Sequence, residues 1–280
     1  MEVFSTKKEV RYRWEQLKRE GKKIGFVPTM GALHQGHLEL VKQAKRENEI
    51  VICSIFVNPT QFDNDEDLKK YPRTLEADCS LLRSVGCHAV FAPSAEEMYD
   101  EIPRLLFNFG NLETVMEGKY RKGHFNGVGT VVAKLFNIVL PDRAYFGAKD
   151  LQQVAVVKRL AKDLSFGLEI IPCETIREKD GLAMSSRNRR LSTNGRKVAF
   201  NVHLSLKIAQ GMLLMGNTVA EAQGAVQNHF KDLPQFSVEY FEIVDFETFE
   251  PIKVLNLGKQ TAICTANYLE GVRLIDNVVF

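Results

Sequence analysis

Two histidines three residues apart could donate hydrogen bonds to a phosphate group. His34 and His37 lie in the segment Pro-Thr-Met-Gly-Ala-Leu-His-Gln-Gly-His at 28–37, between an apolar run and a segment with helical spacing. Gly31 and Gly36 let the backbone approach a ligand, and a helix start offers unpaired N–H groups to an anion. The imidazoles could then stabilise the charge that develops as pyrophosphate leaves. A pair of surface histidines is the alternative, and a zinc pair lacks further ligands at the required spacing.

Two amide side chains follow the next apolar run. Asn58 and Gln61 lie in the segment Phe-Val-Asn-Pro-Thr-Gln-Phe at 56–62. Amides provide paired donors and acceptors that can orient a small polar substrate. The alternative interpretation is a simple turn around Pro59.

Charged residues follow later runs. Lys149 follows a predicted strand and could bind phosphate as a point charge. Gln153 comes shortly after it and is expected at the same edge of the sheet as Lys149. Asp150 could hold that ammonium or cap the next helix, and we expect it to be a cap. The segment Met-Ser-Ser-Arg at 184–187 offers two hydroxyls and a guanidinium, which can bind phosphate oxygens in a bidentate manner.

Two further segments carry several charged side chains. The glycine-rich, basic stretch at 118–129, with Arg121, Lys122 and His124, is expected to be a mobile lid near phosphates, or else a solvated loop. The charged side chains of Glu76 and Asp78 follow Tyr-Pro-Arg-Thr at 71–74, and the sequence leaves their role open.

Strand and helix patterns alternate along the N-terminal part of the chain. Strands are predicted at 23–29, 50–57, 89–92, 144–146 and 168–173, and helices at 38–47, 75–85, 130–140 and 151–164. Such alternation predicts an α/β fold with a parallel sheet, in which the polar residues after each strand meet at one edge. Beyond about residue 187, helices at 194–215 and 219–230 and strands at 237–245, 260–268 and 271–277 predict a separate α+β unit.

Composition narrows the classes of protein. The 280 residues are 45% hydrophobic, and 37 Lys and Arg against 35 Asp and Glu leave a net charge of +2. This balance predicts neither a nucleic-acid nor a membrane partner. Residues 1–20 are basic without the apolar stretch of a signal peptide, and five cysteines form no Cys-x-x-Cys pair. We therefore expect a cytoplasmic protein with reduced thiols.

Five motifs together resemble the pantothenate synthetase (pantoate-β-alanine ligase) family, in the family's order and spacing. They are PTMGALHQGH, FVNPTQF, YPRT, GHFNGVGTVVAKLFNIVLPDRAYFGAKDLQQ and REKDGLAMSSRNRRLS. His34 and His37 alone would indicate only the broader nucleotidyl transferase superfamily with a His-x-Gly-His element. The resemblance implies ATP-dependent ligation of pantoate and β-alanine through a pantoyl-adenylate, releasing AMP and pyrophosphate. It also implies a Rossmann-like ATP- and pantoate-binding domain at 1–176, a smaller α+β lid domain at 177–280, and a homodimer.

The resemblance also carries residue roles. The expected ATP-binding residues are Met30, Gly31, Ala32, Leu33, His34, Gln35, Gly36, His37, Gly147, Ala148, Lys149, Asp150, Ile176, Met184, Ser185, Ser186 and Arg187. Pantoate contacts are expected from Gln61 and Gln153, and β-alanine contacts from Gln61. His37, His34, Lys149 and Arg187 are the expected catalytic residues. No metal ligand is expected from the protein, because Mg²⁺ would be bound mainly through the nucleotide.

The chain departs from the common family pattern at two places. Phe-Asp-Asn-Asp stands at 62–65 where many members have Phe-Gly-Pro-Asn, and Ala148 stands where Glu or Gln is frequent. Both changes concern loop shape and leave the assigned side chains in place.

Two other functions stay open from the residues alone. One is an adenylyl or cytidylyl transferase, which would not use β-alanine. The other is a non-catalytic RNA-binding module that uses Lys and Arg near 119–122 and 187–190, against which the near-zero net charge argues.

Overall fold

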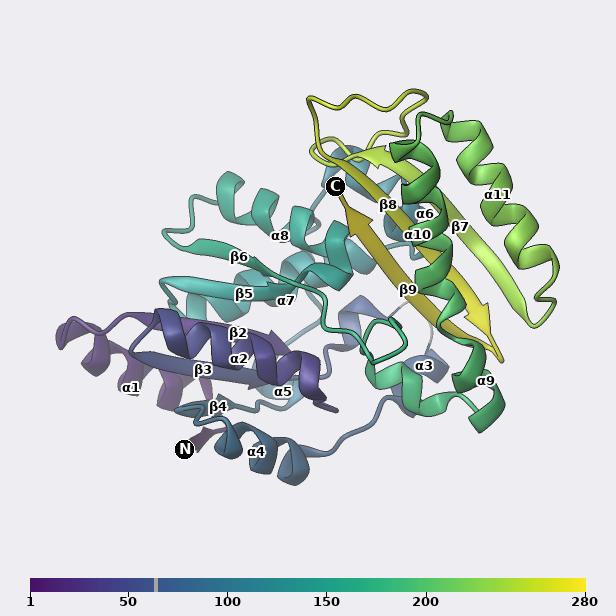
Figure 1. Cartoon of the computed structure of the whole chain (residues 1–280). Helices are drawn as coiled ribbons and strands as arrows, with labels where there is room; N and C mark the ends of the chain where they lie inside the picture. Colours follow the sequence, from purple (N-terminus) through teal and green to yellow (C-terminus); the bar gives the residue numbers. More distant parts are fainter. Residues whose placement is uncertain (63–64) are drawn as a thin grey trace. The chain divides into compact units, whose positions relative to one another are not determined.

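Six short strands from the N-terminal part of the chain form one parallel sheet in the order β1-β4-β3-β2-β5-β6 (Figure 1). They are β1 (Glu2–Phe4), β2 (Ile24–Thr29), β3 (Ile50–Ile55), β4 (Ala89–Phe91), β5 (Arg143–Gly147) and β6 (Glu169–Cys173). From β2 the chain adds β3 and β4 on one side, and then β5 and β6 on the other. Open α/β sheets bind ligands where this direction changes, which here is the carboxyl end of β2 and β5.

The structure is a computed structural model that describes residues 1–62 and 65–280. Its contacts divide the chain into two compact units. Unit 1 is Met1–Glu113, Gly118–Ala148 and Gln152–Glu174, and unit 2 is Thr114–Glu117, Lys149–Leu151 and Thr175–Phe280. The predicted domains, 1–176 and 177–280, stay a prediction. The sequence variation at Asp63 and Asn64 lies outside the described residues.

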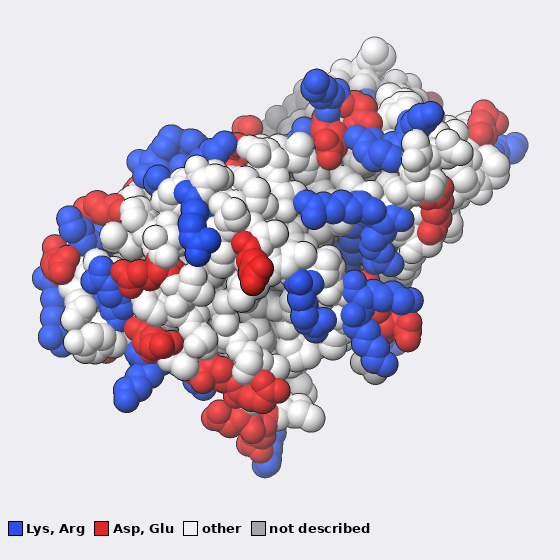
Figure 2. All heavy atoms as spheres, turned by 90° about the horizontal axis from the view of Figure 1, so that it is seen from below, with Lys and Arg blue, Asp and Glu red and all other residues white. Residues whose placement is uncertain are grey.

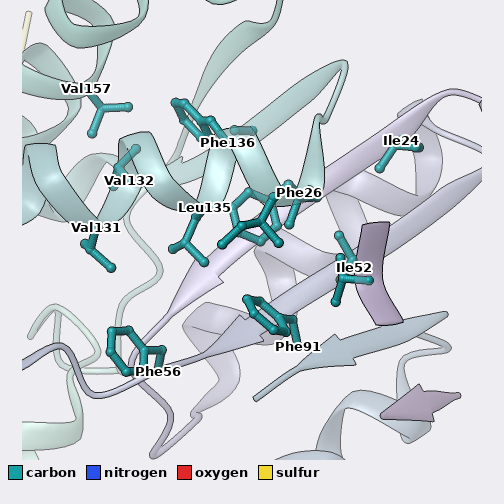
Figure 3. Packing of buried hydrophobic residues seen from close by; sticks show 14 of the residues in the cluster. Ile24, Phe26, Ile52, Phe56, Phe91, Val131, Val132, Leu135, Phe136 and Val157 are labelled. Carbon is teal, nitrogen blue, oxygen red and sulfur yellow. The ribbon is translucent and has the colours of Figure 1, made fainter. Parts of the chain in front are cut away.

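Successive side chains of a strand point to opposite sides of the sheet. On each side of this parallel sheet they pack into a buried cluster. On one side, Phe26 and Ile52 pack with Phe136 (Figure 3). On the other side, Val27 and Cys53 pack in a second buried cluster. The helices that supply these clusters are α1 (Lys7–Arg19), α2 (Gln35–Glu47), α4 (Leu75–Ser84), α5 (Ala95–Met98), α7 (His124–Val139) and α8 (Leu151–Asp163). The predicted α/β fold with a parallel sheet is confirmed.

The sequence analysis did not predict helix α1. Its first turn is stabilised by a capping box, in which the Glu9 backbone N–H donates to Thr6 Oγ1 and the Thr6 backbone N–H donates to Glu9 Oε2. Val10, Trp14 and Leu17 recur at helical spacing on its buried face. The remaining short elements of this part are α3 (Asp65–Lys70), α6 (Met116–Tyr120), η1 (Pro59–Gln61), η2 (Gly110–Glu113) and η3 (Ala148–Asp150).

Unit 2 is an antiparallel sheet with helices on it, which confirms the predicted α+β pattern. The sheet order is β7 (Phe236–Asp245), β8 (Thr261–Leu269), β9 (Val272–Val279). The helices are α9 (Thr193–Val198), α10 (Asn201–Leu214) and α11 (Val219–Lys231), and η4 (Ser186–Arg190) precedes them.

The single predicted helix at 194–215 is wrong, because it breaks into α9 and α10. Asn201 Nδ2 donates to the Val198 carbonyl at 2.8 Å, and the Val202 N–H donates to Ala199, three residues back. The side-chain amide thus takes a carbonyl that a continuous helix would use for its own backbone.

A buried ion pair joins the short segment Thr114–Glu117 to β9 within unit 2. Arg273 donates to both carboxylate oxygens of Glu117, at 2.8 and 2.7 Å, and also to Glu239. Tyr240 Oη donates to Glu117 as well, at 2.8 Å. A buried carboxylate requires such partners, so this segment depends on β7 and β9 for its stability.

The surface carries charges of both signs. Lys and Arg are interspersed with Asp and Glu on the face drawn in Figure 2, as the small net charge leads us to expect. In the part of the chain that the structure describes, none of the helices is long and apolar enough to cross a membrane.

Candidate active site

The loop after β2 is held in an unusual shape by a buried carboxylate. Gly31 and Ala32 both have positive φ angles, +81° and +50°. Two backbone N–H groups of this loop donate to one side chain, that of Asp78. The Ala32 N–H donates to Asp78 Oδ2 at 3.0 Å, and the Leu33 N–H donates to Asp78 Oδ1 at 2.8 Å. Asp78 is only 1% exposed, and it also accepts a hydrogen bond from Thr74 Oγ1. This carboxylate therefore fixes the loop that leads to the two histidines.

His34 and His37 face each other at the start of α2. His34 is the N-cap residue, and its Nδ1 accepts a hydrogen bond from the Gly36 N–H at 3.2 Å. The His34 N–H in turn donates to His37 Nδ1 at 3.3 Å, and the ring centroids are 4.1 Å apart. Each Nδ1 accepts a hydrogen bond from a backbone N–H, so in the neutral imidazole the ring proton is on Nε2. The first turn of α2 therefore offers two imidazole N–H donors next to the positive end of a helix dipole.

Gln61 is brought against the same loop. Its Nε2 donates to Met30 Sδ at 3.1 Å, while its Oε1 accepts from Asn58 Nδ2 at 3.0 Å. Both amides are buried, with 8% of Gln61 and 1% of Asn58 exposed. The structure thus joins two predicted site segments, 30–37 and 56–62, in unit 1.

Tyr99 adds a donor that the sequence analysis did not single out. Its hydroxyl donates to Asn58 Oδ1 at 2.8 Å. Burial raises the pKa of Tyr99, so the phenol stays protonated and keeps donating. The amide of Asn58 is thereby locked with its nitrogen toward Gln61.

The expected mobile lid at 118–129 is wrong for most of that stretch. Residues 124–129 form the first turns of α7, and His124, Gly127 and Gly129 are buried. A Cβ on Gly127 would lie 2.1 Å from the Thr60 carbonyl oxygen, and His124 Nδ1 lies 2.8 Å from the Gln61 carbonyl. Gly127 allows close packing of α7 on η1, and Gly129 allows close packing of α7 against Phe109, so these glycines serve close approach rather than mobility.

Residues after β5 fall in both units. Gly147 and Ala148 belong to unit 1 and lie at the carboxyl end of β5, which pairs with β2. Gln153 also belongs to unit 1, and it lies half-buried on α8. Lys149 and Asp150 belong to unit 2, with 3.3 Å between Lys149 Nζ and Asp150 Oδ1. Of the two roles considered for Asp150, this contact favours holding the ammonium over the capping role that we expected.

The last predicted segment starts a short turn in unit 2. Ser185 caps η4, because its Oγ accepts a hydrogen bond from the Arg187 N–H at 3.2 Å. The Met184 N–H donates to the Ile176 carbonyl at 2.9 Å, which brings two predicted ATP contacts together. Ser186 and Arg187 follow in the same turn and are half-buried.

The residue that sequence reasoning missed most clearly is Asp78. Its partners lie about 45 positions earlier, but its position beside the buried Cys79 and one turn before the buried Leu82 distinguishes it from Glu76, which is exposed. The signal available was a carboxylate at a position where the helix pattern requires burial.

The chain is similar to known proteins over its whole length. The family model described as Pantoate-beta-alanine ligase matches residues 2–279. A pantothenate synthetase from Phocaeicola vulgatus is 48% identical over 281 residues, covering all of this chain and 99% of the relative. One from Cytophaga hutchinsonii is 47% identical over 272 residues, covering 97% of this chain and 96% of the relative.

Solved structures are similar over the same length. A pantothenate synthetase from Thermus thermophilus has a TM-score of 0.92 and 44% identity, with 99% of each chain covered. A pantoate-beta-alanine ligase from Francisella tularensis, described as complexed with beta-gamma ATP and beta-alanine, has a TM-score of 0.83 and 35% identity. It covers all of this chain and 97% of that one.

Proposed function

The chain belongs to the pantoate-beta-alanine ligase family of ATP-dependent ligases, and from this membership we propose that it joins pantoate to β-alanine through a pantoyl-adenylate. The observation that carries the proposal is the pair of imidazole donors at the start of α2, beside the Met30–Gln61 contact. The Francisella relative, described with ATP and β-alanine, supports the choice of these two substrates.

In the first half-reaction the nucleophile is the pantoate carboxylate, which is ionised at neutral pH. One of its oxygens attacks the α-phosphorus of ATP, the bond to the β-phosphate breaks, and pyrophosphate leaves. The protein needs no covalent nucleophile in this step. Its task is to hold the reactants in line, which can contribute about 7–11 kcal/mol.

The leaving pyrophosphate requires positive groups and donors. We assign this role to the Nε2–H groups of His34 and His37, and a donor of this kind can be worth about 3 kcal/mol. Lys149, Ser185, Ser186 and Arg187 of unit 2 would add their charges and hydroxyls. Loop backbone at 30–37, 147–150 and 176 would complete the ATP contacts.

Magnesium would arrive as the magnesium complex of ATP. Among the described residues, no three His, Cys, Asp or Glu side chains gather in a way that could hold a metal ion. Because Mg²⁺ usually keeps several water and phosphate ligands, we propose that it is bound mainly through the nucleotide.

Pantoate and β-alanine complete the reaction. Gln61 and Gln153 are the proposed pantoate contacts, and Gln61 also faces β-alanine. In the second half-reaction the neutral β-alanine amine attacks the acyl carbonyl carbon. The bond from that carbon to the AMP oxygen breaks, and the nitrogen loses a proton. A homodimer in the cytoplasm, which light scattering and localisation can test, completes the proposal.

The decisive experiment is isotope exchange between pyrophosphate and ATP with pantoate present and β-alanine absent. We expect exchange to depend on pantoate and to fall about 100-fold or more in His37→Ala and Lys149→Ala. Lys158→Ala, which removes an exposed lysine of α8, is the matched control and should exchange normally. Exchange that proceeds without pantoate would refute the proposed reaction.

A further inference from the structure

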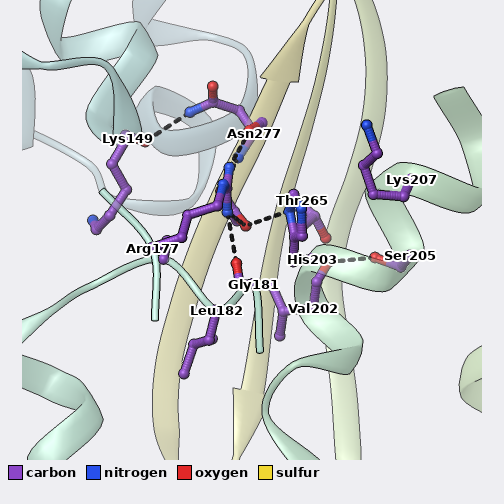
Figure 4. A network of polar contacts seen from close by, with 12 residues as sticks. Lys149, Arg177, Gly181, Leu182, Val202, His203, Ser205, Lys207, Thr265 and Asn277 are labelled. Atoms are coloured by element: carbon purple, nitrogen blue, oxygen red, sulfur yellow. Dashed lines mark hydrogen bonds and ion pairs between the residues drawn. The ribbon is translucent and has the colours of Figure 1, made fainter. Parts of the chain in front are cut away.

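Two adjacent residues of β9, Asp276 and Asn277, hold two different segments of unit 2. Figure 4 shows Asn277 with Lys149 and Arg177, one residue from each segment. Consecutive residues of a strand point to opposite faces, so one strand can reach two neighbours. Asp276 is 2% exposed and Asn277 is 6% exposed. Neither has a role in the proposed reaction.

Asn277 fixes the backbone of Lys149. Its Nδ2 donates to the Lys149 carbonyl oxygen at 2.8 Å, across 128 positions of sequence. This carbonyl lies in the short turn η3, from which the Lys149 side chain extends. The backbone position from which the Lys149 side chain extends is therefore held by an amide of β9.

Asp276 fixes a tight hairpin at 176–184. Backbone hydrogen bonds from Met184 to Ile176 and from Glu178 to Leu182 close this hairpin. Arg177 extends from it and donates to both oxygens of Asp276, at 2.6 and 3.0 Å.

The same guanidinium ties the hairpin to itself and to β9. Arg177 also donates to the Gly181 carbonyl at 3.0 Å and to the Asn277 carbonyl at 3.1 Å. The planar fork of an Arg–carboxylate pair fixes direction as well as distance. The segment 184–187, which follows the hairpin, thus starts from a fixed point.

We propose that Asp276 and Asn277 are positioning residues for the side chains of Lys149 and Arg187. Asn277 sets the backbone of Lys149, and Asp276 acts through Arg177 on the segment that carries Arg187. The proposal rests on the phosphate roles of Lys149 and Arg187 given under the proposed function. It adds that the side chains of Lys149 and Arg187 are both aligned by residues of a single strand, β9.

The test measures the affinity of adenosine 5′-(α,β-methylene)triphosphate, with Mg²⁺, by titration calorimetry. Loss of one hydrogen bond that aligns the ammonium should weaken binding about fivefold in Asn277→Ala. In a Lys149→Ala background the same change should matter less than about twofold, because no ammonium is left to align. Asp276→Asn should also weaken binding of the analogue about fivefold in the otherwise unchanged protein. In an Arg187→Ala background its effect should be less than about twofold, because no guanidinium is left to align.

Asn217→Ala is the matched control. Asn217 Nδ2 donates to the Met212 carbonyl at 3.0 Å, so the variant loses the same kind of bond without any link to Lys149. We expect it to lower the free energy of unfolding while leaving the affinity for the analogue unchanged.

The outcomes separate the two proposals. Equal weakening by Asn277→Ala in both backgrounds would reduce Asn277 to a structural role and overturn positioning. So would an unchanged affinity in Asn277→Ala while Lys149→Ala binds weakly. If Lys149→Ala itself bound the analogue normally, the proposed phosphate role of Lys149 would fail, and the positioning proposal with it.

Discussion

At the scale of single residues, Asp78 and the backbone of His34 set the shape of the loop and cap that present the two imidazoles. The segment at 28–37 indicated a helix start, and α2 begins at Gln35 with His34 as its cap. The hydrogen bond that orients His37 comes from the His34 backbone, which follows from the cap geometry once the helix exists. Asp78 shows the limit, because the helix pattern places this carboxylate on the buried face but does not identify its partners, which are backbone amides about 45 positions away.

Asp78→Ala should destabilise the protein and weaken nucleotide binding together. Two buried N–H groups, of Ala32 and Leu33, would lose their acceptor, which costs about 2–3 kcal/mol of the free energy of unfolding. Urea denaturation and calorimetry with the ATP analogue would measure both effects. Glu76→Ala, on the exposed face of the same helix, should change neither; an equal loss there would show that α4 as a whole is responsible.

Gln61→Ala should affect pantoate more than ATP. The amide is proposed to contact pantoate, so the pantoate concentration for half-maximal exchange should rise about fivefold or more, with that for ATP within about twofold. Steady-state exchange at varied pantoate and varied ATP measures the two separately. Equal changes in both would mean that Gln61 acts only by supporting the Met30 loop.

At the scale of elements, periodicity predicted most strands and helices, and failed where tertiary packing decides. The strands at 50–57 and 144–146 are found with shifted ends, as β3 and β5. The stretch at 118–129 was misread because glycine permits both mobility and close approach, and only the neighbouring η1 reveals which applies. The break after α9 was missed because Asn201 competes for a helix carbonyl without disturbing the apolar spacing.

Two glycine substitutions in helices should have opposite effects on stability. Gly127→Ala forces a Cβ to within 2.1 Å of the Thr60 carbonyl, so we expect a loss of at least about 2 kcal/mol and weaker pantoate saturation. Gly224→Ala on α11 meets nothing within 4 Å and should gain up to about 1 kcal/mol. Thermal and urea unfolding of both variants tests this. A neutral Gly127→Ala would mean that α7 and η1 can separate without cost.

At the scale of the whole molecule, composition predicted reduced thiols, and all five cysteines are free and buried. Burial raises the pKa of Cys87 to about 11 and that of Cys173 to about 12. Such thiols stay protonated and unreactive in the folded chain at neutral pH. Cys53 and Cys173 lie in the predicted strands at 50–57 and 168–173, so their burial was predictable as well, but the particular side chains that pack around each thiol were not.

The free energy of unfolding should fall as the pH rises above about 8.5, where thiols of the unfolded chain begin to ionise. The folded chain keeps its protons until the raised pKa is reached, which for Cys87 is about 11. Each such thiol adds a slope of about 1.4 kcal/mol per pH unit in this window, and no slope below it. Urea denaturation of the wild type and Cys87→Ala from about pH 8 to about pH 10 measures the difference. Parallel curves would exclude a contribution from this thiol.

Along the described chain, the polypeptide passes between the two units five times. A cut after Glu174 would therefore not release two self-sufficient fragments. The longer N-terminal piece would retain Glu117 and Lys149, leaving Arg273 without its buried carboxylate and Asn277 without its carbonyl acceptor in the other piece. Gene dissection of this ligase at residue 174 would leave the hydrophobic clusters whole but would remove two buried polar partners from the C-terminal piece, so its parts have to be studied by point substitution in the intact chain.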